Sequence, residues 1–373
     1  MRFLIAINLG PGAVSQHFTA LAKELVDRGN QVVLLCPGRR HDLEEPDGNP
    51  AIYTWPSHRP TLLRDGIFLH RLLAKKRFDC LIGNFVAVNW ICLVGAAARV
   101  PHRIAWYHTL STQIDQDAPR RTVRGSMQRI RKRLVYKFAT AIVGNSRAAI
   151  LDLRKTYGVP ARKCHVLGFA LPDPMLNGVS EMFPKTPRKI VCAGRLHASK
   201  GQDVLIQALG KLIGAHPELS VEFLGVGPMR AGLEALATTS GVRPNCEFIG
   251  AVPHHEVLER MRAASFTVVP SRTEAFGLVN IESLSVGTPV VGSRVGGIEE
   301  IINDGLDGFL FKPGDVGDLA DKMLLLWEDH ELRSRMSLNA RNKFLAEFAQ
   351  PEATRRQADY LLTLTKPEHL SNA

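Results

Sequence analysis

Short apolar runs that suit buried β-strands alternate with amphipathic helical patterns along almost the whole chain. The expected strands lie at residues 3–7, 31–35, 80–83, 103–107, 141–143, 190–193, 221–224, 246–249, 267–269 and 290–292. Strands that alternate with helices form βαβ units, and these units build parallel sheets. The sequence therefore predicts an α/β fold made of doubly wound parallel sheets.

A break in this pattern divides the chain in two. Residues 171–187 contain several prolines and lack a helical or strand period, which is typical of a linker. We expect an N-terminal Rossmann-like domain over 1–170, joined by a C-terminal helix over 351–373, and a second Rossmann-like domain over 188–350. A chain of 373 residues is long enough for two such domains. Parallel sheets bind ligands at the carboxyl ends of their strands, so the function is expected in a cleft between the domains.

The composition excludes several classes of protein. Hydrophobic residues make up 45% of the chain and charged residues 22%, which is typical of a folded globular protein. No apolar run reaches the roughly 20 residues of a membrane-spanning helix, and the apolar start of the chain fits a strand better than a signal peptide. The six cysteines are scattered without a Cys-x-x-Cys pair, which argues against disulfides and zinc. These features predict a cytoplasmic protein.

The net charge of +11 is distributed unevenly. Up to Phe183 the chain has 26 Lys+Arg against 13 Asp+Glu, and the remainder has 21 against 23, so the first half carries +13 and the second −2. Such an asymmetry indicates a surface that meets an anionic partner, such as a membrane, a nucleic acid or a phosphorylated substrate.

A basic amphipathic helix is the local source of this charge. Residues 119–138 contain no acidic residue, and their apolar residues recur at three- and four-residue steps. The stripe consists of Val123, Met127, Ile130, Leu134 and Phe138. Two interpretations are open. The helix lies on an anionic membrane surface or an acceptor, with Arg124, Arg131 and Arg133 among its contacts, or its stripe packs against the first domain. The membrane interpretation implies a peripheral protein on the inner face of the membrane.

Two strand-to-helix loops of the second half carry residues suited to chemistry. Residues 194–201 follow a predicted strand and contain Arg195 and Lys200, which can grip a diphosphate beside a helix N-terminus. Residues 270–282 follow another strand and contain Glu274 and Glu282, eight residues apart. A carboxylate can accept hydrogen bonds from two adjacent sugar hydroxyls. Solvated loop residues and helix capping are the structural alternatives.

Together these segments resemble the retaining glycosyltransferases of family 4, which have the GT-B fold of two Rossmann-like domains with an interdomain cleft. The Glu-x7-Glu signature of that family stands here as Glu274 and Glu282, and glycine motifs at 224–228, 248–250 and 296–308 support it. The resemblance implies transfer of a hexose-type sugar from a nucleoside-diphosphate sugar, UDP or GDP, to a hydroxyl acceptor. Lipid-linked or cell-surface polysaccharide synthesis is the pathway that it implies.

The resemblance also implies roles for individual residues. Glu282 holds the ribose and Glu274 contacts the transferred sugar, while Arg195 and Lys200 neutralise the leaving diphosphate. Because fixed cations can do this, no metal or other cofactor is expected. The further donor-binding residues that the resemblance implies are Gly12, Gly227, Val252, Phe276, Gly277 and Leu278.

The first domain matches the family less closely. Its first loop has Gly10 and Gly12 on either side of a proline, where the family commonly has a Gly-Gly pair, and Gln16 follows on the acceptor side. His108 ends a predicted strand and resembles the family histidine beside the transferred sugar. The Asp-x-Asp segment 115–117 has the spacing of a manganese site in other transferases, but it does not follow a strand end, so we expect no metal there.

Other functions remain open at the level of sequence. A nucleotide-sugar 2-epimerase of the same fold would use a similar cleft. A non-catalytic nucleotide-sugar-binding protein would need only to bind the nucleotide sugar, without transferring it. The basic composition also suggests nucleic acid, but the basic helix carries no recognised reader motif, so no nucleic-acid partner is expected. A retaining transfer can proceed on the donor's front face or through a covalent carboxylate intermediate, and the sequence does not separate these routes.

Overall fold

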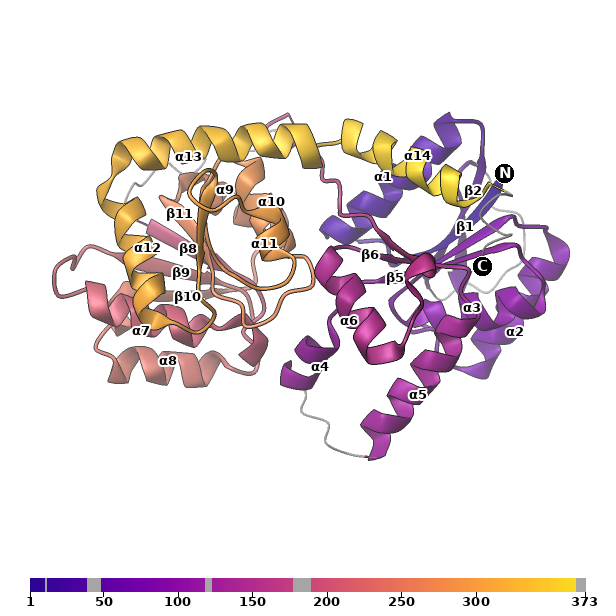
Figure 1. The fold of residues 1–373 in the computed structure, drawn as a ribbon, viewed down its shortest axis with the longest axis horizontal. Helices are drawn as coiled ribbons and strands as arrows, with labels where there is room; N and C mark the ends of the chain where they lie inside the picture. Colours follow the sequence, from indigo (N-terminus) through magenta and orange to yellow (C-terminus); the bar gives the residue numbers. More distant parts are fainter. Residues whose placement is uncertain (11, 39–47, 118–122, 177–188, 367–373) are drawn as a thin grey trace. The chain divides into compact units, whose positions relative to one another are not determined.

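The computed structural model describes residues 1–10, 12–38, 48–117, 123–176 and 189–366, without the side chains of 123–126 (Figure 1). The chain forms two compact units. The first comprises Met1–Ser111, Arg120–Leu171 and Gln350–Ala373, and the second Thr112–Pro119 and Pro172–Ala349. Each unit contains one parallel sheet, so the predicted fold class is confirmed.

The sheet of the first unit has seven strands in the order β3-β2-β1-β4-β5-β6-β7, and every pairing is parallel. These strands are β1 (Arg2–Ala6), β2 (Gln31–Pro37), β3 (Ala51–Trp55), β4 (Cys80–Asn84), β5 (His102–Tyr107), β6 (Ala141–Gly144) and β7 (Cys164–Val166). The order reverses between β1 and β4, so the loops after these two strands leave the sheet in opposite directions and open a crevice there.

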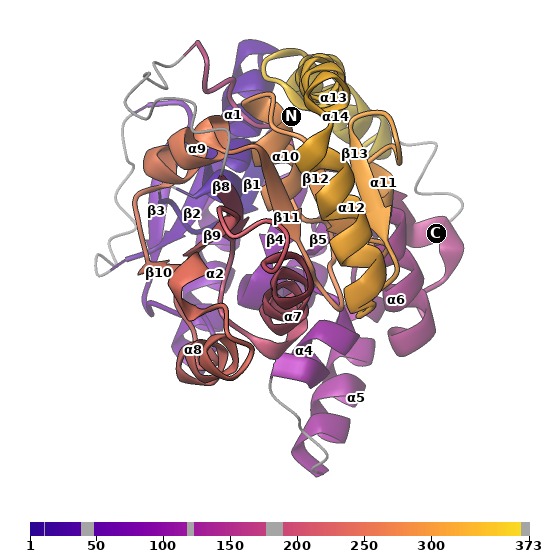
Figure 2. The same cartoon turned by 90° about the vertical axis from the view of Figure 1, so that its left-hand side faces the viewer.

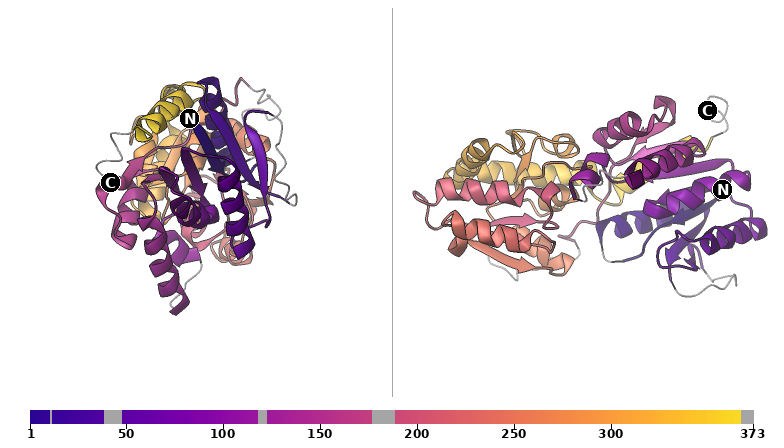
Figure 3. Two further views of the ribbon diagram at one scale, coloured as in Figure 1. Left: turned by 90° about the vertical axis from the view of Figure 1, so that its right-hand side faces the viewer. Right: turned by 90° about the horizontal axis from the view of Figure 1, so that it is seen from below.

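The helices of the first unit cover its sheet (Figure 3). They are α1 (Ala13–Asp27), α2 (Leu63–Lys75), η1 (Phe85–Ala87), α3 (Val88–Ala97), α5 (Val123–Lys137), α6 (Arg147–Tyr157), η2 (Ala161–Lys163) and α14 (Glu352–Leu364). The last helix returns to pack against α1, where the guanidinium of Arg28 donates to Asp359 and to the carbonyl of Arg355. Helix α14 thus attaches the C-terminal segment to helix α1 of the first unit.

The sheet of the second unit has six strands in the order β10-β9-β8-β11-β12-β13, again all parallel (Figure 2). They are β8 (Lys189–Ala193), β9 (Ser220–Leu224), β10 (Cys246–Gly250), β11 (Phe266–Val269), β12 (Val290–Ser293) and β13 (Gly308–Phe311). Here the order reverses between β8 and β11, which places the crevice at the carboxyl ends of these two strands.

The connections of the second unit are helical. They are η3 (Ala198–Lys200), α7 (Gln202–Leu212), α8 (Arg230–Thr239), η4 (Arg243–Asn245), α9 (His254–Ala263), α10 (Leu278–Ser285), α11 (Ile298–Ile301), α12 (Val316–Glu328), α13 (His330–Lys343) and the π-helix η5 (Phe344–Phe348). Ile190 and Cys192 belong to the core under α7 and α12, and Val191 belongs to the core under α9. This alternation shows that helices cover both faces of the sheet.

Several short elements were not predicted. The strands β3, β7 and β13 have five residues or fewer, and the sequence pattern alone did not separate them from loops. The basic helix predicted over 119–138 is described as α5 over residues 123–137, whereas the short helix α4 (Ser111–Asp117) was not predicted separately, and residues 118–122 lie outside the described residues. The predicted linker 171–187 lies mostly outside the described residues, and so does the end of the C-terminal segment.

The remaining composition-based expectations concern cysteines and membrane spans. All six cysteines are free thiols, and all but Cys164 are buried, as expected for core residues. In the described part of the chain no helix has the length and apolar character needed to cross a membrane.

Candidate active site

The two catalytic loops predicted for the second unit leave the sheet at its switch point. Residues 194–201 follow β8, and residues 270–277 follow β11. The amide of Arg272 donates to the carbonyl of Ser199 at 2.8 Å, which ties the loops together. Gly201 has φ +65°, and a Cβ there would lie 2.0 Å from the carbonyl oxygen of Pro270. This glycine is therefore required for the close approach of the two backbones.

Lys200 and Glu274 meet between these loops. The Lys200 Nζ lies 2.5 Å from Oε2 of Glu274, and the hydroxyl of Ser271 donates to the same oxygen at 3.2 Å. The side chains of Lys200 and Glu274 are 17% and 10% exposed, so this ion pair is largely withdrawn from water. The structure thus brings together a cation and a carboxylate that the sequence placed 74 residues apart.

Arg195 lies in the same loop as Lys200 but remains accessible. Its side chain is 59% exposed, and its Nη2 lies 3.4 Å from Oδ2 of Asp117, a residue grouped with the second unit. The other oxygen of Asp117 accepts a hydrogen bond from the amide of Ser199 at 3.3 Å. Asp117 therefore binds the loop through side-chain and backbone groups. In the described ranges no group of three potential metal ligands occurs, and that includes the segment 115–117.

Gly277 begins α10 with φ +93°, a conformation that favours glycine. The amides at the start of a helix mostly lack carbonyl partners within it, although here the amide of Asn280 donates to the carbonyl of Gly277 at 2.9 Å. This helix end is suitable for an anion or a hydroxyl-rich ligand. The flanking residues Phe276 and Leu278 are buried and half-buried, respectively. From a third loop, the amide of Gly297 donates to the carbonyl of Glu274 at 3.1 Å and fixes its backbone.

Glu282 lies within α10 and is held by a residue that the sequence analysis missed. The Nε2 of His254, at the start of α9, lies 2.9 Å from Oε1 of Glu282. The hydrogen bond to this carboxylate raises the pKa of His254 above its ordinary value, although partial burial opposes the shift. The only sequence signal for His254 is its position directly after a proline, in the loop that follows a predicted strand.

This pair makes stability depend on pH in a defined direction. Because the folded-state pKa of His254 lies above the unfolded value near 6.5, its contribution is complete below that value and disappears as pH rises through the folded pKa. We expect His254→Gln to lose about 1 kcal/mol of stability or less at pH 5.5, and nothing at pH 9. Urea unfolding at both pH values measures the difference. The exposed neighbour His255, changed to glutamine, is the control, and an equal loss at both pH values contradicts the expectation.

Gly227 and Val252, also predicted to bind the donor, lie in loops after β9 and β10. A Cβ on Gly227 would lie 2.2 Å from the carbonyl oxygen of Leu196, so this glycine lets the 225–228 loop pack on the loop of Arg195. Val252 is half-buried. Both residues border the same end of the sheet as the loops 194–201 and 270–277, although no described contact joins Val252 to these loops.

In the first unit His108 follows β5 and contacts the end of β4. Its Nε2 lies 2.7 Å from Oδ1 of Asn84, whose Nδ2 donates to the carbonyl of Ala6 at 3.0 Å. Since the Asn84 oxygen accepts, Nε2 carries the proton in this assignment and Nδ1 keeps a lone pair. Nδ1 is buried and has no partner among the described residues. Desolvation, and next the neighbouring His17, lower the pKa of His108 to about 3, so the imidazole is neutral at pH 7.

Phe85 is a second residue of this region that the sequence analysis missed. Its ring stacks on His108 with centroids 4.4 Å apart, yet 51% of the residue is exposed. Its φ of +51° is rare for a side chain of this size, and such strain costs of the order of 1–3 kcal/mol. An aromatic residue at the end of a strand beside the switch point is the signal that could have indicated it.

Gly12 and Gln16 lie at the start of α1. Gly12 is the exposed N-cap, and its carbonyl accepts from the amide of Gln16 at 3.1 Å. Gln16 is half-buried, and its Oε1 is buried without a described partner. The next residue, His17, is fully buried and accepts a hydrogen bond from the amide of Ala170, which makes it a structural residue.

The basic helix α5 leaves most of its apolar stripe in solvent. The exposed fractions are 65% for Met127, 57% for Ile130, 51% for Leu134 and 44% for Phe138. These four side chains therefore do not pack into the first unit, contrary to one of the two interpretations. Of the predicted cations, Arg131 is exposed, and the guanidinium of Arg133 donates to the carbonyl of Thr156. The side chains of Val123 and Arg124 lie outside the described residues.

Solved structures define the class of this fold. The structure superposes on sucrose-phosphate synthase from Thermosynechococcus elongatus with a TM-score of 0.77 and 19% identity, over 97% of this chain and 98% of that one. HepE of Anabaena, solved with UDP and glucose, gives a TM-score of 0.75 with 20% identity over 98% and 100% of the two chains. The fold is therefore that of the GT-B proteins.

Family models match both units. The model of glycosyltransferase family 4 matches residues 14–168, and that of glycosyl transferases group 1 matches 179–343. The chain belongs to the GT-B glycosyltransferases of family 4. Among curated relatives, the D-inositol 3-phosphate glycosyltransferase of Nocardioides sp. is 28% identical over 69% of this chain and 63% of that protein. The first three curated relatives are matched over 35 to 63% of their own length.

Proposed function

We propose that the protein is a retaining glycosyltransferase that moves a hexose-type sugar from a nucleoside-diphosphate sugar to a hydroxyl acceptor. One observation carries the proposal: Lys200 and Glu274 form a buried ion pair at the switch point of the second sheet, beside the accessible Arg195. Family membership and the structures of HepE with UDP and with UDP-glucose support the donor class. We propose UDP as the nucleotide on that ground.

The proposed reaction develops charge where the cations lie. The bond between the anomeric carbon and the diphosphate oxygen breaks, and its electron pair stays on the phosphate. A bond forms from the acceptor hydroxyl to the same face of that carbon, and the hydroxyl proton passes to the leaving phosphate. Arg195 and Lys200 stabilise the growing phosphate charge more in the transition state than in the ground state. This role lets the reaction proceed without a metal.

The carboxylates and the histidine position the sugar and the ribose in this proposal. Glu282, held by His254, accepts hydrogen bonds from the ribose hydroxyls. Glu274, fixed by Lys200 and Gly297, contacts the transferred sugar. The unpartnered Nδ1 of His108 can accept a hydrogen bond from a sugar hydroxyl, because the ring is neutral at pH 7.

Nucleotide binding without added metal tests the proposal. Thermal shift and calorimetry are run with UDP, GDP and ADP on the purified chain. We expect UDP to stabilise the protein most, by about 2.7 kcal/mol when its concentration is 100 times its Kd. If a folded sample responds to none of the three nucleotides, the donor site is wrong. A response that appears only with manganese contradicts the metal-independent mechanism.

We also propose that the acceptor is presented at an anionic membrane, where α5 lies against the lipid headgroups. Its exposed apolar stripe and the cations Arg131 and Lys137 form a surface suited to a lipid interface. In this arrangement the protein is peripheral on the inner face of the membrane. A face of α5 that contacts anionic lipids, rather than one buried in the first unit, would explain why this helix carries so many positive charges.

Vesicle binding by a double variant tests the membrane contact. We expect the chain to bind vesicles of phosphatidylglycerol and phosphatidylcholine at low salt, and we expect Ile130→Asn with Leu134→Asn to weaken this binding at least about tenfold. Removing two large apolar side chains from the interface has an effect of that size. Sedimentation with vesicles measures it. Leu151→Asn, exposed on α6, is the control. Equal binding to pure phosphatidylcholine, or binding that ignores salt, contradicts the proposal.

A further inference from the structure

A pocket of about 270 Å³ lies at the switch point of the first sheet. The ends of β1, β2, β3 and β4 and the segments that follow β1, β3 and β4 form its walls, and all of its described lining residues belong to the first unit. Ligand pockets commonly measure about 300–1,000 Å³, so this one suits a single small group and not an oligosaccharide. The site of the second unit contributes no residue to it.

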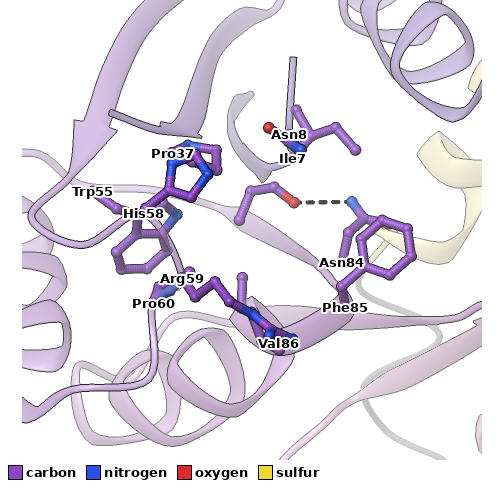
Figure 4. Close-up of a pocket in the computed structure, with 12 residues that line it drawn as sticks. Ile7, Asn8, Pro37, Trp55, His58, Arg59, Pro60, Asn84, Phe85 and Val86 are labelled. Carbon is purple, nitrogen blue, oxygen red and sulfur yellow. Dashed lines mark hydrogen bonds between the residues drawn. The ribbon is translucent and has the colours of Figure 1, made fainter. Parts of the chain in front are cut away.

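The polar lining of the pocket is cationic and amide-bearing. Arg59 and His58 come from the segment after β3, and Asn8 and Asn84 follow β1 and end β4. No carboxylate belongs to its lining as described, and Arg59 is exposed with no described ion-pair partner for its guanidinium. In Figure 4 the side chain of Arg59 extends toward Val86. A guanidinium and an imidazole that face a pocket with no carboxylate among its described lining residues favour an anionic ligand.

The apolar part of the lining includes an aromatic face. Trp55 and Phe85 lie on opposite sides of the pocket in Figure 4. Phe85 adopts φ +51° although glycine or asparagine would fit that backbone better, and half of its surface stays exposed. The stacking of Phe85 on His108 does not by itself account for a residue that is both strained and half exposed. A ring face of this kind suits the apolar face of a sugar or cyclic polyol.

We propose that this pocket selects an acceptor that carries a phosphate group. The guanidinium of Arg59, with His58 beside it, holds the phosphate, and the ring of Phe85 contacts the sugar or polyol that bears it. The proposal rests on the proposed function, since it names the substrate class of the acceptor. The phosphate can belong to a free sugar phosphate or to a lipid headgroup, because both present the same group to Arg59.

Calorimetry on the full chain separates these sources and tests Arg59. Glucose 6-phosphate serves as the free phosphate, glycerophosphoinositol as the soluble form of a headgroup, and glucose as the neutral probe. We expect at least one phosphorylated probe to bind and glucose not to. We expect Arg59→Ala to weaken that binding at least about tenfold and Arg59→Lys to restore part of it. Arg71→Ala, on the exposed face of α2, is the matched control and leaves binding unchanged.

Phe85→Gly gives a second readout that a purely structural role does not produce. Removing the ring weakens binding of the phosphorylated probe about threefold to tenfold. Because glycine relieves the strained backbone, the Tm of this variant stays within a few degrees of the parent. Glucuronate, which carries a carboxylate in place of a phosphate, is an additional control probe. The proposal is overturned if neither phosphorylated probe binds, or if glucose or glucuronate binds as tightly as the phosphorylated probes. It is also overturned if the Arg59→Ala variant binds the phosphorylated probe as tightly as the parent chain.

UDP binding, measured in the same samples, separates this inference from the proposed function. UDP binds the second unit in that proposal, so Arg59→Ala and Phe85→Gly leave the UDP affinity unchanged. If UDP fails to bind the parent chain while the phosphorylated probe binds through Arg59, the donor assignment fails and the phosphate pocket stands. If UDP binds and the phosphorylated probes do not, the pocket assignment alone is wrong.

Discussion

Arg195→Ala is expected to lower kcat about 100- to 1000-fold without a change in Tm. In the proposed reaction this guanidinium stabilises the charge on the leaving diphosphate, and loss of one such donor in other enzymes has an effect of that size. The side chain is 59% exposed, and its neighbour Asp117 keeps its hydrogen bond to the amide of Ser199. The fold therefore loses little when the guanidinium is removed.

The measurement is steady-state release of the nucleoside diphosphate from the donor that binds best in the nucleotide panel. Arg335→Ala, which removes an exposed arginine from α13 of the same unit, is the control and keeps the parent rate. A fall in kcat with an unchanged KM indicates a role in the transition state. If Arg195→Ala turns over donor at the parent rate, the leaving-group role assigned to this residue is wrong.

The location of the site in the second unit could be predicted because its residues follow strands directly. Arg195 and Glu274 each lie in a loop that leaves a parallel strand, and β8 and β11 turn out to be neighbours at the switch point. Sequence periodicity locates such loops, and a parallel sheet brings their strand ends to one edge. What periodicity does not encode is the strand order, and therefore which loops meet.

The partners that were missed are all non-local. His254 reaches Glu282 from 28 residues away, and Asn84 reaches His108 from 24. The two members of each pair belong to segments at or after different strands, so no single motif contains both. The sequence did not reveal the order of these strands in the sheet. Phe85 was missed for another reason. Its positive φ is a tertiary feature, and a phenylalanine gives no sequence signal for that conformation.

The glycines of the loops around Lys200 and Glu274 have a more definite role than the sequence alone indicates. The sequence shows Gly201 only as the last residue of a loop, whereas in the structure its Cβ position is filled by a backbone carbonyl of the neighbouring loop. Gly296 is likewise blocked by the carbonyl of Glu274. Both residues let three loops pack backbone to backbone, and this packing holds Glu274 and Lys200 in place. Rigid placement of charge, rather than mobility, is what electrostatic catalysis requires.

Glu274→Gln is expected to lower kcat about 100-fold or more, and no glycosyl adduct is expected to accumulate on the protein. In the front-face mechanism Glu274 orients the sugar, and glutamine keeps its shape but loses the charge that pairs with Lys200. Removing one partner of a buried pair also destabilises the fold, by about 3–5 kcal/mol in well-buried cases. The activity loss therefore has to be separated from a loss of folded protein.

The double variant Lys200→Met with Glu274→Gln makes this separation. It removes both charges from the buried site, so part of the stability lost in Glu274→Gln returns while activity does not. Activity is measured as donor turnover, stability as Tm, and the adduct by intact-protein mass spectrometry during turnover of the parent chain and of Glu274→Gln. An adduct trapped on the protein contradicts the front-face route and makes Glu274 the first residue to examine as a nucleophile. Recovery of turnover in the double variant shows instead that the single substitution acted through folding, because neither charged group would then be needed for the reaction.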